Sequence, residues 1–191
     1  TPFHPGPGQD VTETMEVSQG KLCMGFLTPI TNRDHRFAAM QVTNGILGGD
    51  VTSKLFQNVR EKQSLCYSIG SGYYAAKGIV LVSAGIDFDK EDHVRREVLS
   101  QLEACQGGQI TDEELAASKQ SLLTALRSVQ DSPSAMENYY SAITMAQTGR
   151  SWETHMELLA KVTKEDVVAC AKTLELHSTY FLEGGDFCAA L

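Results

Sequence analysis

The alternation of polar and apolar residues predicts strands in the first half of the chain and again near its end. Residues 11–18, VTETMEVS, alternate in this way, and the apolar stretch KLCMGFLT that follows is typical of a more buried strand. We expect Gln19-Gly20 to form a tight turn that joins these two strands in a hairpin. Three further strands are predicted at 65–74, at IVLVSAGI (79–86), which is apolar on both faces and hence central, and at STYFLEG (178–184).

Helical spacing of apolar residues dominates the second half. One helix carries Val94, Val98, Leu102 and Cys105 and ends at Gly107-Gly108. A capping box of Thr111 with Glu114 starts the next helix, and Pro133 marks its end. Other helices are predicted from Asn32 or Asp34 to Leu47 and over 53–62, 134–149, 152–159 and 163–173. This order predicts an α+β fold with helices packed on one face of a largely antiparallel sheet.

The glycine pair Gly48-Gly49 follows the first predicted helix. We expect it to permit a sharp turn between two helices, with one of the glycines at positive φ. Replacing Gly49 with Val is therefore expected to destabilise the domain.

Length and charge narrow the class of protein. The 191 residues favour one domain, and the net charge of -8, from 24 acidic against 16 basic residues, argues against nucleic acid as a partner. No segment has the roughly 20 apolar residues that cross a bilayer, and no signal peptide starts the chain, so no membrane partner is expected. Residues 1–10, TPFHPGPGQD, are predicted to be a linker or an artificial chain end, and 11–191 a single domain.

The five cysteines are odd in number and contain no C-x-x-C pair. This spacing argues against a disulfide framework or a zinc ribbon. We interpret them as small buried hydrophobic residues in a reducing compartment, the cytoplasm. A cysteine-dependent redox or metal-binding module is the alternative, which thiol titration and metal analysis would distinguish. The cysteines are Cys23, Cys66, Cys105, Cys170 and Cys188.

Motifs for catalysis or metal binding do not occur in the sequence. None of the histidines lies in H-x-x-E-H or another clustered ligand pattern, and His93 with Glu97 is typical of a solvated contact on a helix. No nucleophile elbow, P-loop or G-x-G-x-x-G is present. We therefore assign no catalytic and no metal-binding residues, and expect the chain alone to hold no zinc and to cleave no peptide.

Arg60 and Tyr67 are the two candidates for a binding role. Both have a structural explanation: Arg60 sits at the end of a predicted helix, where the helix dipole favours a cation, and tyrosine suits a half-buried strand. The functional alternative is geometric. The short turn KQS folds the chain back, so two hydrogen-bond donors would converge on a peptide carbonyl or on an oxygen that gains charge during hydrolysis.

The stretch GILGGDVTSKLFQNVREKQSLCYSIGSGYY resembles the signature of the C-terminal half of pitrilysin/insulinase-type zinc peptidases, the inverzincins. That signature is similar to L-G-G-x-x-x-S-x-L-F-x-x-x-R-E-K-x-x-L-x-Y. The resemblance extends from about residue 11 to 187 through the order and spacing of the predicted elements. The matching residues are Leu47, Gly48, Gly49, Ser53, Leu55, Phe56, Arg60, Glu61, Lys62, Leu65 and Tyr67.

The resemblance implies one half of a clamshell, as in processing peptidases. The other, N-terminal half carries H-x-x-E-H and holds the zinc, so no cofactor is expected in this chain. This half would contribute substrate binding and transition-state contacts through Arg60 and Tyr67. Its expected partners are a peptide substrate and either an N-terminal catalytic half or a homologous active subunit, in a homo- or heterodimer.

Whether the chain belongs to an active enzyme is left open by its sequence. The resemblance implies a parent zinc metalloendopeptidase, of which this chain alone is inactive. The alternative is a non-catalytic scaffold or regulatory subunit of the same family, paired with an active partner chain.

Overall fold

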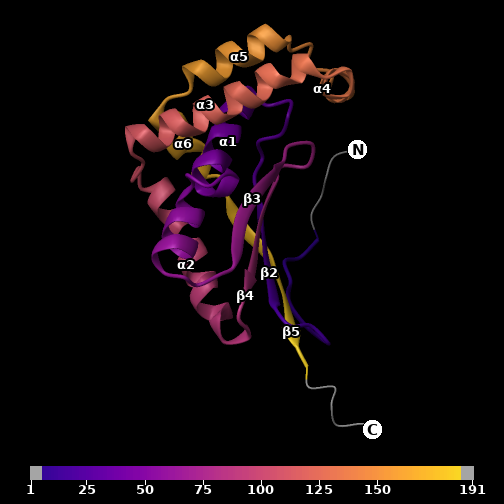
Figure 1. The fold of residues 1–191 in the computed structure, drawn as a ribbon. Coiled ribbons are helices and arrows are strands. Elements are labelled where there is room, and N and C mark those ends of the chain that lie inside the picture. Colours follow the sequence, from indigo (N-terminus) through magenta and orange to yellow (C-terminus); the bar gives the residue numbers. More distant parts are fainter. Residues whose placement is uncertain (1–5, 186–191) are drawn as a thin grey trace.

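A five-stranded sheet forms one layer of the protein in the computed structural model, which describes residues 6–185 (Figure 1). The strand order is β1-β5-β2-β4-β3, with β1 parallel to β5 and the other neighbours antiparallel. The predicted α+β class with a largely antiparallel sheet is confirmed. The bounds are β1 (Asp10–Met15), β2 (Gly20–Leu27), β3 (Ser68–Tyr74), β4 (Ile79–Ile86) and β5 (Glu175–Gly184).

The labelled helices lie on one side of the sheet or beyond its upper end (Figure 1). The predicted capping box of Thr111 and Glu114 is present, and Gly108, with φ 76°, follows the helix that it was predicted to end. The helices are α1 (Phe37–Asn44), α2 (Glu91–Gln106), α3 (Asp112–Ser128), α4 (Pro133–Ala146), α5 (Trp152–Lys161) and α6 (Lys164–Ala171). Shorter helical segments are η1 (Gly45–Gly49), η2 (Leu55–Lys62), η3 (Phe88–Lys90) and η4 (Val129–Asp131).

The core lies between the helices and one face of the sheet. On β2, alternate side chains face the helices and are buried, whereas the residues between them are partly exposed. The neighbouring strand β4 lies between β2 and β3, as predicted, and continues the buried layer. This layer consists of Leu22, Met24, Phe26, Val80, Val82 and Ala84.

The predicted hairpin at Gln19-Gly20 is wrong. Strand β1 pairs with β5 in parallel, and β5 lies between β1 and β2, so the first two strands are not neighbours. The local alternation reports which residues form strands, but the partner of β1 comes from the far end of the chain. Residues just before β1 also lie beside β5, since His177 Nε2 is 2.8 Å from the carbonyl oxygen of Gly6.

The expectation of positive φ at Gly48-Gly49 is also wrong. Neither glycine is among the described residues with positive φ, and Gly48 has φ -159°. Space explains the glycine instead. A Cβ at Gly48 would lie 2.7 Å from Ser71 Oγ, 2.8 Å from Leu55 Cδ1 and 2.9 Å from the backbone nitrogen of Ser71. Glycine at position 48 therefore lets η1 approach β3 and η2 closely.

The described helices include none that is long and apolar enough to cross a membrane. One of the histidines, His4, and one of the five cysteines, Cys188, lie outside the described residues.

Candidate functional site

The turn between η2 and β3 places the two candidate residues. Arg60 lies in the last turn of η2, and the chain reverses at Ser64, whose φ of 51° is left-handed. The reversal is closed by a hydrogen bond from the backbone N–H of Leu65 to the carbonyl of Val59 at 3.1 Å. The chain then enters β3, which begins at Ser68.

The start of β3 differs from the predicted strand over 65–74. Because the strand begins only at Ser68, Leu65 and Tyr67 belong to the preceding turn and do not share one strand face. Leu65 is 7% exposed and joins the core, whereas Tyr67 is 59% exposed. The structural explanation given for Tyr67, a place on a half-buried strand, is therefore wrong, and Tyr67 is directed to solvent.

Arg60 and Tyr67 line the same open cavity, which has a volume of about 410 Å³. Its wall brings together the end of η2, the following turn and the segment after β4. The remaining lining residues are Glu61, Ser64, Leu65, Cys66, Asp87 and Lys90. Cationic, anionic and hydroxyl groups thus surround a hollow that is open to solvent.

Arg60 rests on an aromatic ring. Its Cζ lies 4.6 Å from the centroid of Phe56, one helical turn earlier, and its Nε is 3.8 Å from Glu61 Oε1. A guanidinium over an aromatic face keeps its charge while its planar group is held in orientation. With 40% of its side chain exposed, Arg60 presents a fixed positive charge at the cavity.

Tyr67 donates its hydroxyl hydrogen to Asp87 Oδ1. The other carboxylate oxygen, Oδ2, lies 2.7 Å from the ammonium of Lys90. The hydrogen bond to Asp87 raises the pKa of Tyr67, and the hydrogen bond from Lys90, followed by that from Tyr67, lowers the pKa of Asp87. The same carboxylate raises the pKa of Lys90. At neutral pH the three groups therefore form a chain of a neutral phenol, a carboxylate and an ammonium.

Asp87 and Lys90 were not found from the sequence. A usable signal existed, because the turn at 75–78 pairs Tyr74 with Ile79 and the β3–β4 register continues to Ser68 and Gly85. If this register is continued by two residues beyond Ser68, the residue next to Tyr67 comes opposite Asp87. Lys90 follows three residues later on η3.

The cavity also contains the thiol of Cys66. Burial raises the pKa of the Cys66 thiol, which disfavours a thiolate at the cavity. No group of three or more His, Cys, Asp or Glu residues in the described part of the chain is arranged to hold a metal ion. The described residues therefore do not fit a zinc site.

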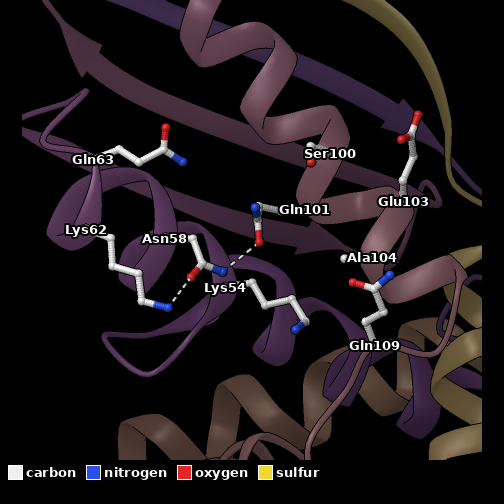
Figure 2. A pocket seen from close by; sticks show the side chains of 9 residues that line it. All are labelled: Lys54, Asn58, Lys62, Gln63, Ser100, Gln101, Glu103, Ala104 and Gln109. Atoms are coloured by element: carbon white, nitrogen blue, oxygen red, sulfur yellow. Dashed lines mark hydrogen bonds between the residues drawn. The ribbon is translucent and has the colours of Figure 1, made fainter.

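A second cavity, of about 520 Å³, lies between η2 and α2 (Figure 2). Its polar groups are largely engaged with one another. Asn58 donates to Gln101 Oε1 at 2.7 Å and accepts from Lys62 Nζ at 2.9 Å, as the dashed lines in Figure 2 mark. Lys54 pairs with Glu114 at 2.8 Å. The smaller cavity is the stronger candidate, because both residues singled out from the sequence, Arg60 and Tyr67, line it.

The chain is similar to known proteins over most of its length. Residues 1–122 match the family model described as "Peptidase M16 inactive domain". The chain is 32% identical over 176 residues to "Probable inactive metalloprotease YmfF" of Bacillus subtilis, covering 92% of this chain and 41% of that protein. It is 32% identical over 162 residues to "Uncharacterized zinc protease Mb2805c" of Mycobacterium bovis, covering 83% of this chain and 37% of that protein.

A solved structure extends the likeness to three dimensions. The conserved protein from Enterococcus faecalis V583 superimposes with a TM-score of 0.88 at 33% identity, covering 97% of this chain and 44% of that one. The chain thus spans less than half the length of these relatives.

Proposed function

We propose, since the chain belongs to the peptidase M16 family as its inactive domain, that it serves as the C-terminal half of a zinc peptidase and binds the peptide substrate there. Arg60 and Tyr67 are the proposed substrate-binding residues. The proposal concerns the whole protein, because its chemistry requires a zinc-bearing half that supplies the water-activating metal.

The shared cavity of Arg60 and Tyr67 is the observation that carries the proposal. Tyr67 is 59% exposed and the side chain of Arg60 is 40% exposed, so neither is enclosed in the core. Leu55 and Val59, both 0% exposed, together with Leu65, provide the apolar packing of this region. The polar ends of Arg60 and Tyr67 are therefore available to a ligand.

The length of the relatives supports a partner half. The chain covers 41% of YmfF and 44% of the Enterococcus faecalis protein, so each has room for a second unit of similar size. We propose that 11–191 form one C-terminal-half domain and that an N-terminal catalytic half, or a homologous active subunit, completes the enzyme. Zinc is proposed for that partner, and the relative from Mycobacterium bovis is called a zinc protease.

A reducing compartment such as the cytoplasm is also proposed. Cys23, Cys66, Cys105 and Cys170 are free thiols, of which the last two are buried. A thiol that packs as a small hydrophobic residue is compatible with either redox state, but free thiols persist most readily where the surroundings are reducing.

Substitution of the two site residues tests the function. In the protein that contains both halves, or in the complex with the active subunit, Arg60→Ala should lower kcat/KM for peptide hydrolysis by about 10²-fold. Tyr67→Phe should lower it by about 10-fold, the scale of one hydrogen bond. Lys62→Ala is the matched control, because Lys62 lies on the same segment but lines the other cavity.

The outcomes separate the proposal from its alternative. Normal turnover of both variants with unchanged thermal stability would remove Arg60 and Tyr67 from the site. A protein that holds its partner tightly but hydrolyses no peptide, with zinc bound, would instead favour a scaffold or regulatory subunit. If the two residues act together, the double variant should lose less than the two single losses combined.

A further inference from the structure

We propose that Asp87 and Lys90 are positioning residues that fix the Tyr67 hydroxyl as a hydrogen-bond acceptor for a backbone N–H of the substrate. The inference rests on the proposed function and specifies which atom of a peptide Tyr67 contacts. Arg60 is then the donor of the pair and Tyr67 the acceptor.

The single hydroxyl hydrogen of Tyr67 is already engaged in the structure. A phenol has a single O–H to donate, whereas an ionised carboxylate can only accept. In the structure that O–H is directed to Asp87 Oδ1. The phenol oxygen consequently has only its lone pairs left for another partner, and the exposure of Tyr67 makes them accessible from the cavity.

Lys90 supports the hydrogen bond that Tyr67 donates to Asp87. Its ammonium lies 2.7 Å from Asp87 Oδ2, whereas Tyr67 donates to the other oxygen, Oδ1. Lys90 and Tyr67 together lower the pKa of Asp87, so the group is a carboxylate at neutral pH. Hydrogen bonds to a charged acceptor are stronger than those between neutral groups. A substrate carbonyl that sought the Tyr67 hydrogen would therefore compete with an ionised carboxylate already in place.

Arg60 and Tyr67 then offer one partner for each polar atom of a peptide unit. Each peptide unit offers one C=O acceptor and one N–H donor. The Arg60 guanidinium carries only donors, and the Tyr67 oxygen, with its hydrogen engaged, only accepts. Such a pair recognises the backbone of an extended peptide and is insensitive to the side chains of the substrate.

Single-atom changes in the ligand test the assignment. The probe is a fluorescein-labelled unstructured casein peptide, together with a set of copies in which one backbone N–H at a time is replaced by an ester oxygen. Affinity is measured by fluorescence anisotropy with the protein containing both halves, in EDTA to stop turnover. One ester position should weaken binding to the unsubstituted protein by about 5–10-fold, the scale of one hydrogen bond. The same ester should have no effect on Tyr67→Phe.

Variants of Asp87 separate positioning from general structural damage. Asp87→Ala should reduce the ester effect and raise KM with little change in kcat. Asp87→Asn, whose Oδ1 still accepts the Tyr67 hydrogen, should restore most of the effect. In the chain studied alone, Asp87→Ala should also lower the pKa of Tyr67 toward its usual value, measured by ultraviolet difference against Tyr67→Phe.

Two results would overturn the inference. One is an ester set in which no position distinguishes the unsubstituted protein from Tyr67→Phe. The other is a higher kcat for Asp87→Ala, because the carboxylate would then restrain a hydroxyl that acts as a donor. If Arg60→Ala binds the unmodified peptide as the unsubstituted protein does, the proposed function itself fails, which is a separate outcome.

Discussion

Acidification should destabilise the domain through one buried histidine. His155, on α5, is 6% exposed and has both ring nitrogens engaged. Nε2 lies 2.7 Å from Gln41 Oε1 on α1, and Nδ1 lies 3.2 Å from the Tyr139 hydroxyl on α4. Since the amide oxygen can only accept, Nε2 is the donor, and neutral Nδ1 is left to accept from Tyr139. The ring thus links three helices in its uncharged form.

The sign of the effect follows from the pKa. Burial, and to a lesser degree the charge of Arg150, lower the pKa of His155 from 6.5 to about 4. Because the folded-state pKa lies below the unfolded one, the stabilising contribution is complete above pH 6.5 and is lost as the pH falls toward 4. Each pH unit in this window corresponds to about 1.4 kcal/mol, so the free energy of unfolding should fall by about 3 kcal/mol.

Urea denaturation at a series of pH values from 7.5 to 4.5 measures this loss. The matched variant is His155→Gln, which stays neutral throughout and should show a much flatter pH dependence, whatever its stability at pH 7.5. Between pH 6.5 and 4.5 the carboxylates with lowered pKa, such as Asp10 and Asp34, remain ionised and contribute little. A flat profile for the unsubstituted chain, or parallel profiles for the two proteins, would refute the reasoning.

Two further predictions concern packing. Gly48→Ala should destabilise the domain by about 1–3 kcal/mol, because the new Cβ would meet backbone and side-chain atoms closer than 3 Å. In Gly49→Ala the nearest atom to the new Cβ is 3.3 Å away, so this variant should be less destabilised. Equal midpoints of urea denaturation for the two variants would contradict this prediction. Glu114→Gln should lower the free energy of unfolding by about 3 kcal/mol, because it leaves the buried ammonium of Lys54 without a counter-ion. The side chain of Lys54 is only 8% exposed. Lys54→Met, which removes the charge itself, should be less destabilising in the same assay.

Local sequence patterns predicted most of the helices and strands, because these elements depend on residues that are close together in the sequence. The capping box at Thr111 follows from side chains three residues apart, and the apolar run of β4 correctly indicated a strand with neighbours on both sides. Pairing of β1 was missed because it depends on β5, about 170 residues away. The reason for glycine at position 48 was missed likewise, since it lies in contacts with Leu55 and Ser71.

The candidate site shows the same division. Arg60 and Tyr67 were identified through a sequence resemblance, and the structure places both on one cavity, while their role remains a prediction. The expectation that Tyr67 donates to the substrate did not take into account Asp87, to which Tyr67 donates in the structure, and it stays a prediction. The residue type determines which hydrogen bonds a side chain can form, but its neighbours in the structure determine which of them remain available to a ligand.

The relative position of Arg60 and Tyr67 depends on how η2 meets β3. Leu55 is the first residue of η2, which carries Arg60, and Ser71 lies on β3, the strand that follows Tyr67. A Cβ at position 48 would lie within 3 Å of atoms of both residues. A methyl group at position 48 must therefore push η2, β3 or both, and the two site residues move with them. Peptide affinity should accordingly fall in Gly48→Ala by more than in Gly49→Ala, even under conditions where both variants are fully folded. A loss of stability with unchanged affinity would show that the site is held by its own turn at Ser64 and not by this contact.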